Sequence, residues 1–563
     1  MSTEKLDETL DERMMRNDDA RELTQHNMDI PVFRLPPELM AQIFSYCVPS
    51  PDSAYGGLKW LYITHVCRRW RIIALEYAPL WTYIELRHPK LAETMVERSK
   101  TAILSLHTPW YFPMTRDAWQ CPMESLQRQL FRLGHLSLRL YVSTRMEPLV
   151  DFVQQLTQSA PLLRSIEIHS SPMLDLPHNF IAHNAPLLRH LHLKYTYLPW
   201  NSALLSNLTH LDLLGDGQTN IPTAEQLLRV LRAMPKLEVL ALSYVFPDGM
   251  DRLAEIVLPR LRELRLSGNI GGCEGVLNNI VFPETTVLNL SCAIEQNDID
   301  PFYSFLSHFP RIFRAHSSSI GTHGRTEKPR TVKTLLIHLL SSDDTPCLTF
   351  SAWNEDTLPL YAFEYGPDFV KLPAPSIHMT LQWDPEQALA DVEEDLETIF
   401  SSLPMHSVET LHLRGIRDYD LDEEGIGAFL VRHLGTLPFN STGVKTIVVS
   451  GDALHDELSE ICDMLRRIDP SVSPAGLAFP VLHTLVLTSS PADFWRLAPH
   501  GGPTDMAVLL EMLAHRFGSG KRIEVLMARC FWLLRAEEVG VLREVVGELT
   551  EFPEITDLME SGR

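Results

Sequence analysis

Residues that could do chemistry are plentiful in this chain, but none of them forms a catalytic motif. Gly518-Ser519-Gly520-Lys521 has the ending of a phosphate-binding loop, yet His515 stands where the first glycine of such a loop belongs. Arg522 stands where that loop needs a hydroxyl to bind magnesium. The sequence has no serine-hydrolase elbow, zinc-protease motif or dinucleotide-binding glycine motif. We therefore predict a protein that is not an enzyme and that binds no cofactor.

One group of residues could in principle bind a metal ion. Glu167, His192 and Asp212 each lie between the apolar residues of a predicted strand. If neighbouring strands are in register, these three side chains line up on one face, about 4.8 Å apart from strand to strand. Imidazole and carboxylate groups are zinc ligands. A polar surface that recognises a protein is the favoured alternative, so we predict no metal site.

The charge and the cysteines restrict the partners and the compartment. The chain has 563 residues and a formal net charge of −23, which disfavours nucleic acid and anionic membranes as partners. The eight cysteines are scattered, without a C-x-x-C pair, as expected of reduced thiols inside a cell. The acidic N-terminus lacks the apolar core of a signal peptide, and no apolar stretch is long enough to span a membrane. These features predict a cytoplasmic or nuclear protein.

Two patterns of apolar residues indicate how the chain is organised. In residues 35–48, LPPELMAQIFSYCV, the prolines suit a helix start and the apolar residues that follow have helical spacing. A second helical run extends from Leu58 to Tyr77. A unit as small as residues 31–86 buries little surface, yet it is rich in large apolar side chains. We therefore expect part of that surface to dock on another protein or on the rest of the chain.

From about residue 100 a leucine pattern recurs, often proline followed by x-x-Leu-x-Leu. Its central residues are 20 to 29 positions apart, close to the period of leucine-rich repeats, and are Ile166, Leu191, Leu211, Leu240, Leu264 and Leu288. Weaker copies lie 76, 36, 38 and 41 residues apart, at Leu335, Leu411, Ile447, Leu485 and Leu526. Helical patterns such as Thr223–Ala233 lie between the strands. Strand plus helix, repeated, predicts a curved solenoid with a parallel sheet; an ordinary α/β domain is the alternative.

The first of these two regions resembles an F-box. The resemblance rests on Leu35-Pro36-Pro37-Glu38-Leu39, on Ile43-Phe44 and on Val66-Cys67-Arg68-Arg69-Trp70, in that order, and covers about a tenth of the chain. The segment from Pro49 to Gly57 between the two halves is longer than the family pattern. F-box proteins bind a Skp adaptor and, through it, a cullin. The resemblance implies adaptor contacts by the apolar positions of both halves, some of which could instead be internal packing: Leu35, Pro36, Leu39, Ile43, Phe44, Val66, Cys67 and Trp70.

The sequence thus predicts an α/β protein with a small helical F-box-like module and an irregular leucine-rich-repeat solenoid with outer helices. The predicted segments are a disordered acidic tail (1–30), the module (31–86), the solenoid (87–555, with an exposed loop near 316–330) and a second tail (556–563). The concave face of the sheet would bind a target protein through outward-pointing residues: Glu167, His169, His190, His192, Lys194, His210, Asp212, Glu263, Arg265, His412 and Arg414.

The function that these predictions favour is substrate recognition in a Skp–cullin–F-box type ubiquitin ligase. The main alternative is an interaction scaffold outside any ligase, in which the helical module caps the end of the solenoid. In that case the module would pack fully on the repeats and leave no apolar patch. A hydrolase or transferase built on the solenoid is a third possibility, which would require a pocket with convergent titratable groups.

Overall fold

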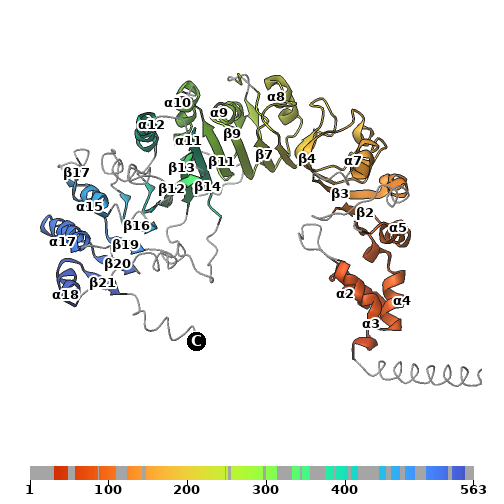
Figure 1. Cartoon of the computed structure of the whole chain (residues 1–563), viewed down its shortest axis with the longest axis horizontal. Coiled ribbons are helices and arrows are strands. Elements are labelled where there is room, and N and C mark those ends of the chain that lie inside the picture. Colours follow the sequence, from red (N-terminus) through yellow and green to blue (C-terminus); the bar gives the residue numbers. More distant parts are fainter. Residues whose placement is uncertain are drawn as a thin grey trace, which may run out of the picture. The chain divides into compact units, whose positions relative to one another are not determined.

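The computed structural model describes most of the chain, and Figure 1 labels its helices and strands. The described residues are 31–48, 58–86, 88–108, 123–141, 147–247, 249–250, 255–295, 299–313, 332–342, 345–354, 374–384, 389–403, 407–415, 443–451, 458–469, 476–488, 503–529 and 536–551. The predicted tails and the predicted loop near 316–330 lie outside these residues. The chain divides into two compact units, Met1–Leu205 and Ser206–Arg563.

Unit 1 begins with a group of short helices. Proline starts two of them: Pro36 is the N-cap of α2 with Pro37 at its first position, and Pro79 lies in the first turn of η3. The thiol of Cys67 accepts a hydrogen bond from the Trp70 backbone N–H at 3.4 Å and so caps α4. The helices are η1 (Pro31–Arg34), α2 (Pro37–Ser45), η2 (Leu58–Tyr62), α3 (Ile63–Val66), α4 (Arg68–Glu76) and η3 (Ala78–Trp81).

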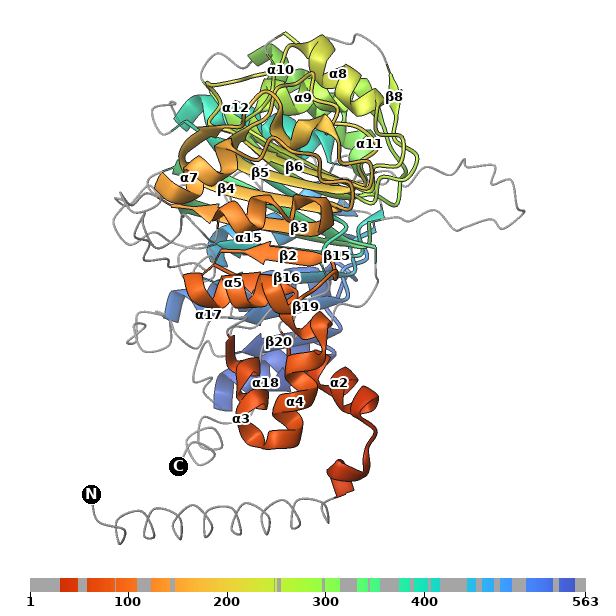
Figure 2. The same cartoon turned by 90° about the vertical axis from the view of Figure 1, so that its right-hand side faces the viewer.

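Aromatic side chains form the core of this helical module. The rings of Phe44 on α2 and Trp70 on α4 lie 4.9 Å apart, and those of Trp60 and Trp81 lie 5.2 Å apart, edge to face. The indole N–H of Trp81 donates to the Ala74 carbonyl at 2.8 Å. Because α2 and α3 both pack against α4 (Figure 2), these contacts join the two halves of the module.

The rest of unit 1 is a five-stranded parallel sheet with helices. Its strands pair in chain order: β1 (Tyr83–Glu85), β2 (Leu104–His107), β3 (Leu133–Leu140), β4 (Ser165–Asp175) and β5 (His190–Tyr197). Its helices include α5 (Pro89–Arg98), α7 (Glu147–Gln154), η4 (Leu130–Arg132) and η5 (Phe180–His183). Along β3 to β5 the leucines and isoleucines are buried and alternate with partly exposed polar residues, as the Leu-x-Leu pattern predicts.

Unit 2 contains a larger sheet, in which one strand is antiparallel to its neighbours. The strands pair in the order β6 (His210–Leu214), β7 (Val239–Ser243), β9 (Glu263–Asn269), β11 (Val287–Ile294), β14 (Ile377–Trp383), β13 (Thr345–Trp353), β12 (Thr334–Ser342), β15 (Thr410–Gly415), β16 (Thr446–Gly451), β19 (Thr484–Thr488), β20 (Val525–Arg529) and β21 (Glu548–Glu551). Only β13, among these described strands, runs against both neighbours.

The helices of unit 2 lie along one face of this sheet (Figure 1). They are α8 (Ala224–Arg232), α9 (Ile270–Asn279), α10 (Ile299–Ser307), α11 (Phe309–Phe313), α12 (Leu389–Ser402), α15 (Leu458–Arg466), α17 (Pro503–Gly518) and α18 (Ala536–Val545). The predicted Thr223 cap of α8 is present, because its hydroxyl accepts from the Gln226 N–H at 3.2 Å. Two small sheets pair β8 (Ile256–Val257) with β10 (Ile280–Val281), and β17 (Ile468–Asp469) with β18 (Gly476–Leu477).

The repeated leucines fall in register within each unit. Ile166 pairs with Leu191 in unit 1, and Leu211, Leu240, Leu264 and Leu288 pair in succession in unit 2. Each of these six side chains is at most 3% exposed. Identical positions in successive strands therefore stack into one continuous apolar row per unit. The protein is a mixed α/β chain in which a helical N-terminal region precedes sheet made mostly of parallel strands.

Candidate functional site

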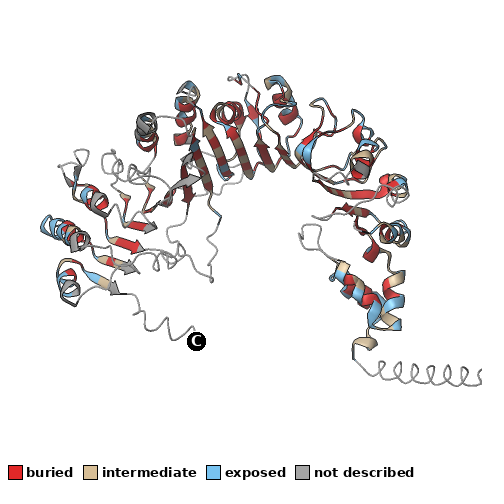
Figure 3. Ribbon diagram, in the orientation of Figure 1, coloured by how far each residue is buried: buried red, intermediate tan, exposed pale blue. Residues whose placement is uncertain are grey.

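The helical module exposes a set of large apolar side chains. On α2, Leu39 and Ile43 are each 46% exposed, and Tyr46, just after the helix, is 89% exposed. Their spacing of four and three residues places them on one side of the helix, whereas Met40, Ala41 and Phe44 are buried on the other. Tyr62, Val66 and Ile72 are also exposed on η2, α3 and α4. We call these six residues the exposed apolar residues of the module. Figure 3 shows that exposed and buried stretches alternate along the helices of this part of the chain.

Of the predicted adaptor contacts, four are exposed and four are not. Pro36, Leu39, Ile43 and Val66 are exposed. Leu35, Cys67 and Trp70 are half-buried. Phe44 is only 1% exposed and lies against Trp70. Phe44 thus packs inside the module in this structure, which is the alternative given above for these positions. The adaptor contacts of the eight residues stay predictions.

Three exposed apolar residues of the module were not among the predicted contacts. Tyr46 follows Ile43 by three residues, so the helical spacing could have placed it on the same side of α2. Tyr62 and Ile72 lie in the second helical run, which reads as one periodic stretch in the sequence. The chain breaks that stretch at Cys67, where the backbone is extended between α3 and α4. This break changes which residues face inward, and nothing in the spacing indicates it.

Arg69 on α4 binds the backbone of the segment that precedes α2. Its guanidinium donates hydrogen bonds to the carbonyl oxygens of Phe33 and Leu35, the latter at 2.8 Å. It also lies over the Phe33 ring, 5.7 Å from the ring centre. These bonds fix the path of the chain that leads into Pro36, and so the start of α2. Arg69 of the Cys-Arg-Arg-Trp motif thus has a structural role that the sequence pattern alone does not specify.

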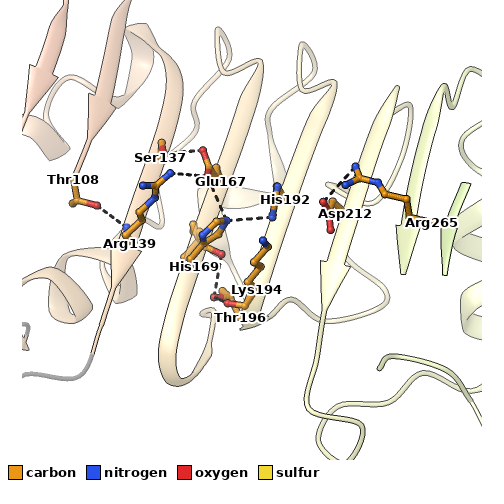
Figure 4. A network of polar contacts seen from close by, with 11 residues as sticks. Thr108, Ser137, Arg139, Glu167, His169, His192, Lys194, Thr196, Asp212 and Arg265 are labelled. Atoms are coloured by element: carbon orange, nitrogen blue, oxygen red, sulfur yellow. Dashed lines mark hydrogen bonds and ion pairs between the residues drawn. The ribbon is translucent and has the colours of Figure 1, made fainter. Parts of the chain in front are cut away.

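A second group of polar residues lies on the face of the unit 1 sheet opposite its buried leucines and isoleucines, which we call the strand face (Figure 4). The Glu167 carboxylate accepts from the Ser137 hydroxyl at 2.9 Å and lies 3.7 Å from the Arg139 guanidinium. The Nε2 atom of His169 lies 3.3 Å from that carboxylate and 3.2 Å from Nε2 of His192. The register explains this clustering, because Ser137, Glu167 and His192 are cross-strand neighbours in β3, β4 and β5.

Burial and neighbouring charges shift the pKa values of this group. Burial, together with His192, lowers the pKa of His169 to about 4. Burial alone would raise the pKa of Glu167, but the Ser137 hydrogen bond and the nearby His169, His192 and Arg139 outweigh it and lower that pKa. At neutral pH the carboxylate is therefore charged and the His169 ring is neutral, so one ring nitrogen can donate and the other can accept a hydrogen bond.

Acidification is expected to destabilise unit 1 through His107, which is 5% exposed and stacks on Tyr83 with ring centres 4.3 Å apart. Burial lowers the pKa of His107 to about 4, whereas an unfolded chain takes up this proton near pH 6.5. The unfolded state therefore binds more protons between these values, and stability falls as the pH drops from about 6.5 towards 4. Between pH 7.5 and 5.0 this loss is on the order of 2 kcal/mol.

Urea unfolding at the two pH values checks this expectation. We expect His107→Gln to lose less stability on acidification than the wild type does. His65→Gln serves as the matched control, because His65 is an exposed histidine of the same unit. An equal loss of stability in the wild type and His107→Gln would contradict the assignment.

In unit 2 the predicted target contacts include an arginine that is already ion-paired and a histidine that is buried. Arg265 lies 3.7 Å from Asp212 and 3.2 Å from Glu263, so its charge is compensated. His412 is only 1% exposed, and burial lowers its pKa to about 3. The His412 ring is therefore covered and neutral in this structure, and its contact with a target stays a prediction. Its outward position on the strand was predicted, but not that neighbouring side chains cover it.

The remaining predicted strand-face residues keep some access to solvent. Lys194, His210 and Arg414 are half-buried, and His190 is exposed. The predicted alignment of Glu167 and His192 is present as a cross-strand pair, whereas Asp212 belongs to the other unit. Within the described part of the chain, no group of three or more histidine, cysteine or acidic residues is arranged to hold a metal ion.

Three further findings complete the description: one on membrane-spanning helices and two from comparisons with known proteins. None of the helices in the described ranges is long and apolar enough to cross a lipid bilayer. A search of curated proteins finds no match to this chain. Residues 32–87 match the model of the F-box-like family. The module that carries the exposed apolar residues is therefore an F-box-like domain, and this supports an F-box protein.

Proposed function

We propose that this chain is a substrate-recognition subunit of a Skp–cullin–F-box type ubiquitin ligase. The observation that carries the proposal is that the F-box-like domain exposes Leu39, Ile43 and Val66 within the part of the chain that the family model matches. Small helical units seldom leave such residues in water unless a partner covers them. F-box domains generally bind Skp-type adaptors, and the adaptor would bring the cullin.

The sheets of the two units would supply the other half of this function. The in-register leucine rows and the helices beside the strands support an irregular leucine-rich-repeat solenoid, interrupted by the antiparallel β13. The strand face would hold a target protein, with Glu167, His169, His192 and Lys194 among its contacts. The chain itself would catalyse no reaction. It would act by proximity, because a target held beside the ubiquitin-conjugating enzyme presents its lysines at a high effective concentration.

An interaction scaffold outside any ligase is less well supported. In that alternative the helical module packs against the repeats and hides its apolar side chains. Ile43, Tyr46 and Val66 are instead 46%, 89% and 58% exposed. The protein would carry out this function in the cytoplasm or nucleus, where ubiquitin ligases work.

Co-purification from cells tests the proposal. The wild-type chain is expected to recover a Skp-type adaptor together with a cullin. The variant Leu39→Ala/Ile43→Ala/Val66→Ala is expected to recover neither, because each substitution removes apolar surface from the proposed interface. The matched control is Ile103→Ala/Phe131→Ala, which truncates two exposed apolar residues of unit 1 outside the module. Equal recovery of the adaptor by both variants would overturn the assignment of the interface.

A further inference from the structure

One side of α4 in the helical module exposes two arginines together with an apolar residue. Arg71 and Ile72 follow Arg68 by three and four residues, so the three side chains share one side of the helix. Both arginines are exposed, and Ile72 is 47% exposed. Ile73 and Ala74, by contrast, are buried. The two guanidinium groups therefore border an apolar side chain that remains in contact with water.

Val66 extends this surface beyond the start of α4. Its side chain is 58% exposed. Cys67, which separates Val66 from Arg68, has an extended backbone with φ −159° and ψ 170°. In an extended backbone alternate side chains point to the same side, which places Val66 beside Arg68. We call Val66, Arg68, Arg71 and Ile72 the arginine surface of the module.

The charges of the arginine surface are not compensated by carboxylates. Among the described residues, no carboxylate oxygen lies within 4.0 Å of the guanidinium of Arg68 or Arg71. Arg69, between them in the sequence, is instead bound to backbone carbonyl oxygens. Residues 31–81 contain five lysines or arginines and three acidic residues, a formal charge of +2, although the whole chain carries −23. The module is thus a basic region of an acidic chain.

The position of these arginines does not favour the helix that carries them. Arg68 is the first residue of α4, and the first turn contains no acidic residue. The aligned peptide dipoles make the N-terminal end of a helix positive, so an anion there stabilises the helix and a cation destabilises it. We therefore attribute the charge of Arg68 to binding rather than to folding.

We propose that the arginine surface binds acidic side chains of the Skp-type adaptor, next to the apolar residues that the adaptor covers. The inference rests on the proposed function and deepens it, because it assigns a charge to the partner's docking surface. Val66 belongs both to the proposed adaptor contacts and to the arginine surface, and this continuity identifies the adaptor as the occupant. A partner with basic residues at this place would be repelled.

The chemistry of arginine suits such a contact. A guanidinium can donate two parallel hydrogen bonds to one carboxylate, and these charge-assisted bonds are stronger than neutral ones. When the adaptor covers Val66 and Ile72, water leaves the neighbourhood of both arginines, and the lower local dielectric strengthens the ion pairs. The arginine surface would therefore add affinity and orientation to an interface whose centre is apolar.

Calorimetric titration of a purified Skp-type adaptor into the full-length chain, at two salt concentrations, tests the inference. In 0.1 M NaCl, where charges interact over about 10 Å, Arg68→Glu/Arg71→Glu is expected to bind about tenfold or more weakly than the wild type. In 1 M NaCl, where this range falls to about 3 Å, the difference should shrink at least about threefold. A loss of affinity that salt does not change would indicate lost packing and overturn the inference.

Matched variants separate the local charge from the overall charge. Lys90→Glu/Arg128→Glu changes the net charge equally, at exposed positions of unit 1 outside the module, and should bind as the wild type does. Arg68→Gln/Arg71→Gln removes the two charges without adding new ones and should bind with intermediate affinity. Urea unfolding should show that Arg68→Glu/Arg71→Glu is at least as stable as the wild type, because glutamate favours the start of a helix.

The possible failures of the inference and of the proposed function are distinguishable. If the wild type binds the adaptor and the two glutamate variants bind it equally well, the inference is overturned while the proposed function stands. If the wild type binds no adaptor at either salt concentration, both are overturned.

Discussion

Truncation of Phe44 to alanine is expected to unfold the helical module while leaving the two sheets folded. The side chain is 1% exposed and its ring lies 4.9 Å from that of Trp70. Truncating a buried phenylalanine to alanine lowers the free energy of unfolding by about 3–5 kcal/mol, because the apolar ring is no longer buried and a cavity remains in its place. A helical unit of this size has little stability to lose. The contact joins α2 to α4, so its loss separates the two halves of the F-box-like pattern.

Hydrogen exchange resolved along the sequence measures this effect. We expect Phe44→Ala to lose amide protection throughout the helices of residues 31–81, with unchanged protection in β3 to β5. Tyr46→Ala is the matched control, because this aromatic residue is 89% exposed and two positions away. Substitutions at such surface positions usually change stability by less than about 0.5 kcal/mol. Protection that survives in Phe44→Ala, or is lost equally in Tyr46→Ala, would contradict the assigned packing.

The repeated part of the fold could be predicted from the sequence because one physical rule generates it. In x-x-Leu-x-Leu, alternate side chains enter the core, and neighbouring strands cover each other. The residues at 166, 191, 211, 240, 264 and 288 all fall at buried, in-register positions. The Thr223 cap was likewise predictable, because a hydroxyl three residues before a glutamine satisfies two helix-end N–H groups reciprocally.

The interruption of the repeat could not be predicted in the same way. The wide spacing of the later copies, with 76 residues from Leu335 to Leu411, predicts inserted or missing repeats, but it does not predict which strands pair. Among the described strands, β11 pairs with β9 and β14 and not with β12. β14 takes the place beside β11, and β13 runs antiparallel between β14 and β12. Strand pairing across residues 287–383 depends on long-range contacts that a local pattern does not record. The sequence of β13, TPCLTFSAW, indicates a strand but not its direction relative to its neighbours.

The candidate site was predictable in its location but not in the orientation of each residue. The Leu-Pro-Pro-Glu-Leu and Cys-Arg-Arg-Trp patterns predict the module at residues 31–86, and the family match covers residues 32–87. Helical spacing correctly grouped Leu39 with Ile43, but Phe44 is adjacent to Ile43 and faces the opposite way. Which apolar side of a helix faces its own module is decided by its partners, here Trp70 on α4. The packing of α2 against α4 is a tertiary contact, which helical spacing does not record.

Replacing Ile43 with glutamate is expected to abolish adaptor binding without unfolding the module. Ile43 is 46% exposed, on the side of α2 opposite the buried Met40 and Phe44, so a carboxylate there stays hydrated in the free protein. In the proposed complex the same carboxylate would be buried against apolar surface without a counter-ion. Loss of a central apolar contact costs about 2–4 kcal/mol, and an uncompensated buried charge adds to that cost. The affinity should therefore fall at least about 100-fold.

Calorimetric titration of a purified Skp-type adaptor into the full-length chain tests the central claim most directly. Wild type and Phe131→Glu, which places the same charge at a position in unit 1 that is 58% exposed, should bind the adaptor with equal affinity, and Ile43→Glu should bind at least about 100-fold more weakly. Far-ultraviolet circular dichroism of the three proteins should be the same. If folded Ile43→Glu binds the adaptor as tightly as the wild type does, the exposed apolar residues of the module are not the adaptor interface.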